Sequence, residues 1–284
     1  MYFWRRREVQ GTVLLLPYLL VFVLFVIVPQ VQTAAGSFMG GENLLSNYVT
    51  AFSMPRFRIA LLHTAGYTVL ASLLVLLLAF PTAYLIHRII NRHKRIRYLI
   101  AMPYASSFMA LSMIWLMFFN PQNGLINKLL PLFGLTAQNW LESPGLAFLC
   151  VFSLVFWRGF CFTLFNCLLA MERMPKEVHE SAAISGASAM QEVVHIAMPQ
   201  MQPTLLYVIP TAVVSVLTTF EPILLLYYAG MSPDMTGSLV YVFYQQANLG
   251  QPGVASAIAV LLLVPIMICC YGYSRYIFGR KAAK

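Results

Sequence analysis

Long apolar runs and shorter polar connections alternate along the chain. Six runs come near the roughly 20 residues that an α-helix needs to cross about 30 Å of hydrocarbon, at about 1.5 Å per residue. The runs lie at about 12–33, 61–86, 98–119, 145–170, 203–227 and 254–274. This pattern predicts an all-α, polytopic membrane protein in which six transmembrane helices form a single domain over residues 1–284.

The composition supports a membrane protein and excludes several other classes. Of the 284 residues, 60% are hydrophobic and only 10% are charged, whereas soluble proteins have about 25% charged residues. So few charges cannot cover the surface of a water-soluble globule of this size. A secreted domain, a cytosolic enzyme and a nucleic-acid-binding protein are therefore poor interpretations.

The positive charges predict the orientation in the membrane. Of the 18 Lys and Arg residues, Arg158 lies in a span, and Arg56, Arg58 and Lys128 lie in loops on one side. All the others lie in segments on the opposite side, namely the N-terminus, 87–97, 171–202 and the tail from Arg275. By the positive-inside rule this second side is cytoplasmic, and so are both termini.

Two features bear on processing and on a metal site. The basic residues Arg5 to Arg7 precede the first apolar run as in a signal peptide, but the stretch from Val13 to Val28 is longer than a usual h-region. We therefore expect an uncleaved first span. The five cysteines fall in predicted spans without the C-x2-C pairs of a zinc site, so we expect neither a metal nor a cofactor on this chain.

The connection at about 171–202 is long and amphipathic. Pro175 suits the first turn of a short helix that ends near Ile184. Gly186 permits a break, and Pro199 ends the segment that follows. The pattern predicts two short helices in an elbow on the cytoplasmic face, which indicates a docking site for a partner protein.

The spacing in this elbow resembles the signature E-A-A-x3-G-x9-I-x-L-P of the permease subunits of binding-protein-dependent ABC importers. The matching residues are Glu180, Ala182, Gly186, Ile196 and Pro199, with Ser181 for the first alanine and Met198 for leucine. Where the family usually has Asp before the glycine, this chain has Ser185. The likeness extends over nearly the whole chain. Within the family, the chain most resembles the first permease subunit of maltose and glycerol-3-phosphate type importers.

This resemblance implies a type I ABC importer permease fold in a bacterial or archaeal cytoplasmic (inner) membrane. It implies a second, non-identical permease subunit, two ATP-binding subunits and an extracytoplasmic solute-binding protein as partners. It also implies that the elbow couples ATP hydrolysis to transport through Glu180, Ser181, Ala182, Gly186, Ile196 and Pro199. The chain has no G-x4-G-K-[ST] motif, so it is not expected to be an enzyme, and ATP and Mg²⁺ are expected on the partners.

The substrate that the resemblance implies is a sugar or oligosaccharide, with glycerol phosphate or another polyol ester as the alternative. The fifth span adds an observation of its own. At about 100° per residue, Thr211, Ser215, Thr218 and Thr219 fall on one arc about 120° wide. These hydroxyls either line a wet cavity that binds sugar hydroxyls or are small residues for close helix packing with back-bonded side chains. We take the four as candidate residues of the substrate pathway.

Two charged residues within the spans bear on another class of function. Arg158 would cost at least about 2.5–3.5 kcal/mol in hydrocarbon, so it should face protein or water, and an ion pair or backbone contact is favoured over substrate binding. Glu221 stands near the outer end of the fifth span. An ion-coupled secondary transporter needs a membrane-embedded titratable site, and only these two residues are candidates, without paired acids or a visible inverted repeat.

Overall fold

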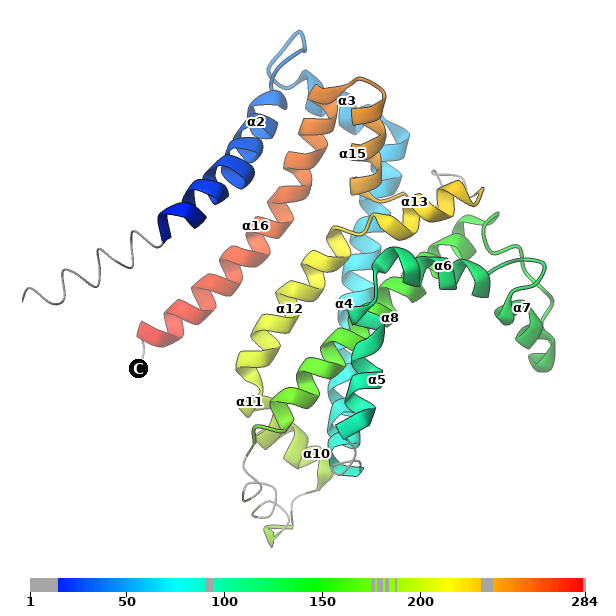
Figure 1. Cartoon of the computed structure of the whole chain (residues 1–284), viewed down its shortest axis with the longest axis vertical. Helices are drawn as coiled ribbons and strands as arrows, with labels where there is room; N and C mark the ends of the chain where they lie inside the picture. Colours follow the sequence, from blue (N-terminus) through cyan, green and yellow to red (C-terminus); the bar gives the residue numbers. More distant parts are fainter. Residues whose placement is uncertain are drawn as a thin grey trace, which may run out of the picture. The chain divides into compact units, whose positions relative to one another are not determined.

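The computed structural model describes residues 15–89, 94–174, 177, 181, 184–186, 188–230 and 237–282, and every regular element in these ranges is helical (Figure 1). The α-helices are α2 (Val28–Gly36), α3 (Ser46–Ser53), α4 (Pro55–Ile89), α5 (Lys94–Ala105), α6 (Phe108–Phe118), α7 (Leu125–Leu129), α8 (Pro144–Met171), α10 (Ala189–Glu192), α11 (Met198–Gln200), α12 (Gln202–Leu217), α13 (Glu221–Tyr228), α15 (Leu239–Asn248) and α16 (Pro252–Ala282). Val23–Ile27 and Val193–Ala197 form π-helical turns, and Leu130–Phe133 forms a 3-10 turn.

Five helical segments of the described residues are long and apolar enough to cross a membrane. They are Leu15–Gly36, Pro55–His87, Pro144–Met171, Gln202–Tyr228 and Pro252–Arg275. A sixth candidate is the pair Leu99–Ala105 and Phe108–Phe118, if these two helices, bent by 105°, count as one span. The all-helical, polytopic character predicted from the apolar runs is confirmed, and each candidate overlaps one of those runs.

Two of the candidates are broken at positions that the apolar pattern does not reveal. In the fifth run α12 ends at Leu217 and α13 begins at Glu221. Pro222 accounts for this break, because in a continuous helix its ring would clash with the carbonyl of Thr218. In the third run the bend follows Pro103 and falls at Ser107, whose ψ of 134° is not helical.

Contacts between Cα atoms divide the chain into two compact units. The first comprises the described residues up to Met54 together with Val242–Val264. The second runs from Pro55 to Tyr241 and resumes at Pro265. The candidate sites described below all lie in the second unit.

A buried asparagine holds the first unit together. The side-chain NH2 of Asn47 donates to the carbonyl of Ser37 at 3.0 Å and to that of Met39 at 2.8 Å. Gly253, at the start of α16, lies against the same amide: a Cβ there would be 2.7 Å from Asn47 Nδ2 and 2.9 Å from the Met39 oxygen. Only glycine fits at this approach.

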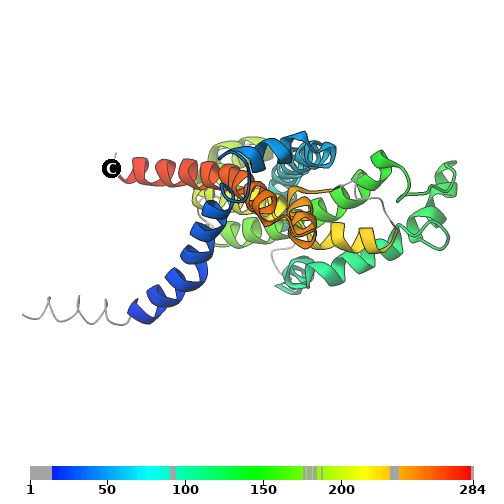
Figure 2. The ribbon, with the colours of Figure 1, turned by 90° about the horizontal axis from the view of Figure 1, so that it is seen from above.

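In the second unit α4 and α8 pack along one another, and α5 and α12 pack against them (Figures 1 and 2). Small residues permit the close approach, as is usual between membrane helices. A Cβ on Gly159 of α8, for example, would lie 3.4 Å from the Cγ2 atom of Val75 in α4. One buried cluster surrounds Tyr67 and Val151, and a second surrounds Phe80 and Met171 and includes Ala197 from the elbow.

Candidate functional site

The turn at the centre of the predicted elbow is left-handed. Gly186 has a φ of 69°, a conformation that glycine adopts without steric cost. A Cβ at this position would meet no atom of the described chain within 4 Å. The backbone angle therefore accounts for the glycine, and no neighbour from the described residues fills the space beside it.

The first half of the elbow is only partly described. Glu180 and Ala182 lie outside the described residues. Ser181 is exposed, and the side chain of Ile184 is 88% exposed. The described part of this half therefore presents an apolar side chain and an open glycine turn away from the rest of the chain.

The second half of the elbow begins with an N-terminal helix cap and contains a widened, π-helical turn. Ser188 and Gln191 form a capping box: the Gln191 side chain accepts the Ser188 N–H at 2.8 Å, and Ser188 Oγ accepts the Gln191 N–H at 3.3 Å. The π-helical turn Val193–Ala197 follows and ends two residues before Pro199. A regular helix would drive the ring of Pro199 into the carbonyl of His195, and the wider turn relieves that clash.

This second half is anchored to the spans. The hydroxyl of Tyr84 in α4 donates to the Oε2 atom of Glu192 in α10 at 2.7 Å. Ala197 is fully buried in the cluster that Met171 and Met201 share, whereas Ile196 is half-buried and Pro199 is exposed. The second half of the elbow is therefore joined to α4 by a charge-assisted hydrogen bond and to α8 by buried packing.

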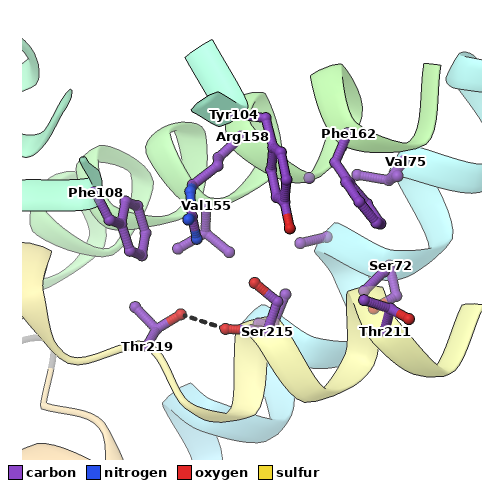
Figure 3. A pocket seen from close by; sticks show the side chains of 14 residues that line it. Ser72, Val75, Tyr104, Phe108, Val155, Arg158, Phe162, Thr211, Ser215 and Thr219 are labelled. Carbon is purple, nitrogen blue, oxygen red and sulfur yellow. Dashed lines mark hydrogen bonds between the residues drawn. The ribbon is translucent and has the colours of Figure 1, made fainter. Parts of the chain in front are cut away.

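A second candidate site is a cavity between α4, α5, α6, α8 and α12 (Figure 3). Its polar side chains are Ser72, Tyr104, Arg158, Thr211, Ser215 and Thr219. The volume is about 30 Å³, which corresponds to one water molecule and is well below the roughly 300–1,000 Å³ of typical small-molecule sites. In this conformation the cavity is closed to a sugar.

Arg158 of α8 brings a positive charge to the cavity wall. Its Cζ atom lies 5.2 Å from the centroid of the Tyr104 ring and 4.4 Å from that of the Phe108 ring, which is cation–π geometry. Figure 3 shows the guanidinium between the two rings and directed toward α12. Its Nε atom is buried without a hydrogen-bond partner, and no carboxylate of the described residues pairs with it. The ion pair or backbone contact expected from the sequence is not found in the described part of the chain.

The hydroxyls of the fifth span are divided by the end of α12. Thr211, Ser215 and Thr219 line the cavity, and Thr218 does not. The angular positions assigned from the sequence assume one continuous helix, and they do not hold for Thr218 and Thr219, which follow the last helical residue, Leu217. Thr211 donates its hydroxyl hydrogen to the Tyr207 carbonyl at 2.7 Å, and Thr219 donates to the Ser215 carbonyl at 3.3 Å. Cavity lining and back-bonding, set out above as alternatives, coexist.

Thr219 also belongs to a buried polar network. Its carbonyl accepts the Ser238 hydroxyl at 2.8 Å, and next along the chain the Leu239 N–H donates to the Thr64 hydroxyl at 3.1 Å. Thr219, Ser238 and Thr64 are at most 2% exposed. The network fixes the break between α12 and α13 to α4, so one wall of the cavity is rigidly placed.

Sequence reasoning identified the α12 hydroxyls and singled out Arg158, but it did not place the two on one cavity. A cation inside an apolar span was the available signal for Arg158, whereas nothing in the sequence pointed to Tyr104, Phe108 or Ser72 as its neighbours. Within the described residues, no three His, Cys, Asp or Glu side chains gather as a metal site would require.

Comparison with known proteins places these sites in a wider context. The sequence model of the family described as "Binding-protein-dependent transport system inner membrane component" matches residues 79–282. The arabinooligosaccharides transport system permease protein AraP of Bacillus subtilis (strain 168) is 27% identical, over 89% of this chain and 83% of its own length. The trehalose/maltose transport system permease protein MalF of Thermococcus litoralis is 25% identical, over 92% of this chain and 91% of its own length.

A solved structure has the same fold. A chain of a bacterial alginate ABC transporter, crystallised in complex with an alginate pentasaccharide-bound periplasmic protein, superposes with a TM-score of 0.78. The match covers 96% of each chain at 22% sequence identity.

Proposed function

Because the chain belongs to the family of inner membrane components of binding-protein-dependent transport systems, we propose that it is the permease through which one such system imports a carbohydrate. It is a transport subunit and not an ATPase. The partners proposed are an extracytoplasmic solute-binding protein, a second and non-identical permease, and two ATP-binding subunits that carry ATP and Mg²⁺.

The cavity is the observation that carries the carbohydrate proposal. Hydroxyl groups from α4 and α12 and a guanidinium from α8 converge on one small space within the membrane-spanning helices. Such groups can replace the water around a polyhydroxylated solute. Two relatives named for the transport of oligosaccharides or disaccharides agree with this choice of solute.

In the proposed pathway the solute crosses against α12. Thr211, Ser215 and Thr219 line the cavity in this conformation, and Thr218, whose side chain is exposed, follows Leu217, the last residue of α12. Because the cavity has room for only about one water molecule, passage requires the helices to separate. The second permease would provide the remaining wall.

The elbow is the proposed site of coupling to an ATP-binding subunit. Glu180, Ser181, Ala182, Gly186, Ile196 and Pro199 are assigned to it on the spacing of the signature. Ile184 is exposed, and no described residue fills the space beside Gly186, which supports a surface that a partner covers. The Tyr84–Glu192 hydrogen bond would carry the movement from this surface into α4.

The proposed orientation places the elbow, residues 87–97 and the tail from Arg275 in the cytoplasm, with both termini. Residues 34–60, 120–144 and 228–253 would face the outside. Single cysteines at Met190 and Gly134, in a background without the five native ones, test this arrangement with a membrane-impermeant thiol reagent. We expect labelling of intact cells at position 134 only, and labelling at position 190 would contradict the orientation.

Transport itself is tested with the purified assembly in proteoliposomes. The sugar carried by the co-purified binding protein is identified by mass spectrometry, and its uptake is measured with ATP available to the ATP-binding subunits. We expect uptake to require ATP and to persist when ion gradients are collapsed. Uptake that follows an ion gradient without ATP would instead establish a secondary transporter.

A second candidate is the import of glycerol phosphate or another polyol ester. The guanidinium of Arg158 favours it, because no described residue pairs with this group and arginine binds phosphate oxygens through paired hydrogen bonds. Adding sn-glycerol-3-phosphate to the same uptake assay separates the two candidates.

A further inference from the structure

We propose that the third span is a hinge that Arg158 holds in a bent state, and that the cavity opens when this span straightens. In the structure α5 and α6 are bent by 105°, with the break at Ser107. The opening is inferred to serve the proposed transport, but the hinge does not depend on which solute is imported.

The length of the third apolar run suits a straight helix. As one helix, residues 98–119 would extend about 33 Å, which is enough to cross about 30 Å of hydrocarbon. As bent, the run is divided between α5, with 12 residues, and α6, with 11. Neither helix is long enough to cross a membrane by itself. The sequence thus provides for a complete span that the bent conformation does not form.

The sequence permits the bend but does not enforce it. No proline or glycine occurs between Tyr104 and Asn120, so the backbone of this stretch can continue as a helix. Pro103 would clash with the carbonyl one turn earlier, at Leu99, and not with one at the bend. In the fifth run, by contrast, Pro222 enforces the break. A bend that the backbone does not enforce depends on contacts with the rest of the chain, so a change in those contacts can reverse it.

Ser107 is the point about which the span turns. The hydrogen-bond ladder of α5 extends to Ser106, whose N–H donates to the Met102 carbonyl at 3.1 Å. That of α6 starts where the Leu111 N–H donates to the Ser107 carbonyl at 3.0 Å. The φ of Ser107, −57°, is already helical, whereas its ψ of 134° is not. With a helical ψ at this residue, the two ladders would join.

Arg158 contacts both sides of the hinge. Its guanidinium carbon lies 5.2 Å from the centroid of the Tyr104 ring, which belongs to α5, and 4.4 Å from that of the Phe108 ring, which belongs to α6. Figure 3 shows the guanidinium between the two rings. A single cation of α8 therefore joins the end of one helix to the start of the next.

This arrangement of the rings requires the bend. In a straight helix Tyr104 and Phe108, four residues apart, would lie on one face with Cβ atoms about 5–6 Å apart. That spacing is too small for a guanidinium to lie between the ring faces at the observed distances. The two cation–π contacts therefore stabilise the bent state and are lost together in the straight one.

Opposing interactions act at the hinge. α6 begins without a side-chain cap, so the N–H groups of its first turn gain carbonyl partners when the helix is continuous. The cation–π contacts of Arg158 and the hydrogen bond from Trp115 Nε1 to Ser153 Oγ at 2.9 Å favour the bent state. Removal of the guanidinium should therefore shift the population toward the straight state while α6 remains a helix.

Straightening would open the cavity. Tyr104, Phe108 and Arg158 all line it, and its volume in the bent state is about 30 Å³. Loss of the two ring contacts frees this wall to move away from α8. The hinge thus supplies one route by which the helices separate, as passage of a solute requires.

The test measures the distance between spin labels at Leu99→Cys in α5 and Met117→Cys in α6, in the whole assembly without the native cysteines. The two side chains are 66% and 72% exposed. At about 1.5 Å per residue, the labelled positions are about 17 Å apart with the observed bend and about 27 Å apart in a straight helix. We expect the short distance at rest and a growing long-distance population with ATP and the loaded binding protein. One short distance under all conditions would overturn the hinge.

Arg158→Gln is compared with wild type at rest, without nucleotide, so that the result does not depend on the proposed function. We expect the ratio of long to short distances to rise about tenfold, because both cation–π contacts are lost. Arg158→Lys keeps a cation near the rings and should raise the ratio less. The matched control is Arg275→Gln, which removes an exposed cation outside the cavity and should leave the ratio unchanged. An unchanged ratio in Arg158→Gln would show that Arg158 does not hold the bend.

Ser107→Pro tests the hinge from the opposite direction. Proline fits the φ of −57° in the bent state, but in a straight helix its ring would clash with the Pro103 carbonyl. We expect normal assembly, the short distance under all conditions, and uptake lowered at least tenfold. Ser107→Ala at the same position favours a continuous helix, so it should raise the long-distance ratio and retain uptake. Normal uptake with Ser107→Pro would show that transport does not need the span to straighten.

Discussion

The elbow and the cavity both depend on an interruption of regular helix, but they differ in how much of their surroundings this chain supplies. At the elbow, a Cβ on Gly186 would meet no atom of the described residues within 4 Å, and Ile184 is 88% exposed. At the cavity, the interruption after Leu217 is enclosed, with Thr219 and Ser238 each 1% exposed and hydrogen-bonded to one another. The elbow is therefore a surface that a partner would complete, whereas one wall of the cavity is already complete within the chain.

Substitution of Gly186 should give the largest effect and tests whether the elbow depends on a partner. Gly186→Leu places a side chain in a left-handed turn, at about 1–2 kcal/mol, and also fills the space proposed for the ATP-binding subunit. We expect the chain to insert normally while uptake and attachment of the ATP-binding subunits are lost. Both are measured on the same preparation, by uptake in proteoliposomes and by co-purification.

Gly134 supplies a matched control for this change. Its φ is 72°, and a Cβ there also meets no described atom within 4 Å, but it lies in a loop proposed to face outside. Gly134→Leu should cost similar backbone strain and preserve coupling. Loss of uptake in both variants would assign the effect to strain, and normal uptake with Gly186→Leu would refute the coupling role.

Substitutions in the cavity should lower uptake without preventing assembly of the complex. Ser215→Leu places a branched apolar side chain in the cavity, which should lower uptake by about tenfold or more while the assembly remains intact, since a polar contact and space are both lost. Val214→Leu, one residue away in α12 and outside the cavity, should leave uptake nearly unchanged. Transport and yield of assembled complex are measured together, because a fall in yield with Ser215→Leu would support helix packing instead of cavity lining.

Thr219 tests whether the helix break beside the cavity is enclosed, in contrast to the elbow. It lines the cavity but is also buried, so Thr219→Leu should overpack the break and cost about 1–3 kcal/mol of stability. We expect a lower yield of complex and a lower melting temperature in detergent, in addition to lost uptake. If the yield and melting temperature of Thr219→Leu equal those of Ser215→Leu, the enclosed character of the break is wrong.

The smallest effect is expected where the elbow is joined to the spans. Tyr84→Phe removes a hydrogen bond to a carboxylate, worth about 1.5–3 kcal/mol, while keeping the packing of the ring. We expect uptake per ATP hydrolysed to fall severalfold, with ATP hydrolysis and assembly retained. Glu192→Gln keeps an acceptor for the Tyr84 hydroxyl, so it should lower this ratio less than Tyr84→Phe does. An unchanged ratio in Tyr84→Phe would show that force reaches α4 by packing alone.

The sequence was sufficient for the helical, membrane-spanning character because long apolar runs have few alternatives in a bilayer. It also located the turn at Gly186, since a glycine between two helical patterns is a local signal. It did not reveal that the fifth run breaks at Pro222, so the angular positions of Thr218 and Thr219 were misjudged. The environment of Arg158 was beyond sequence reasoning, because the rings of Tyr104 and Phe108 reach it from two other helices only in the folded chain.

The back-bonded threonines at the end of α12 have a consequence for the biosynthesis of the protein. A broken helix exposes backbone carbonyls, and in lipid each unsatisfied one costs several kcal/mol. Thr218 and Thr219 donate their hydroxyl hydrogens to the carbonyls of Val214 and Ser215 at 2.9 and 3.3 Å. Side chains of the same segment therefore satisfy these two carbonyls at the helix break. We therefore expect that a newly inserted subunit needs no partner helix to satisfy these two carbonyls.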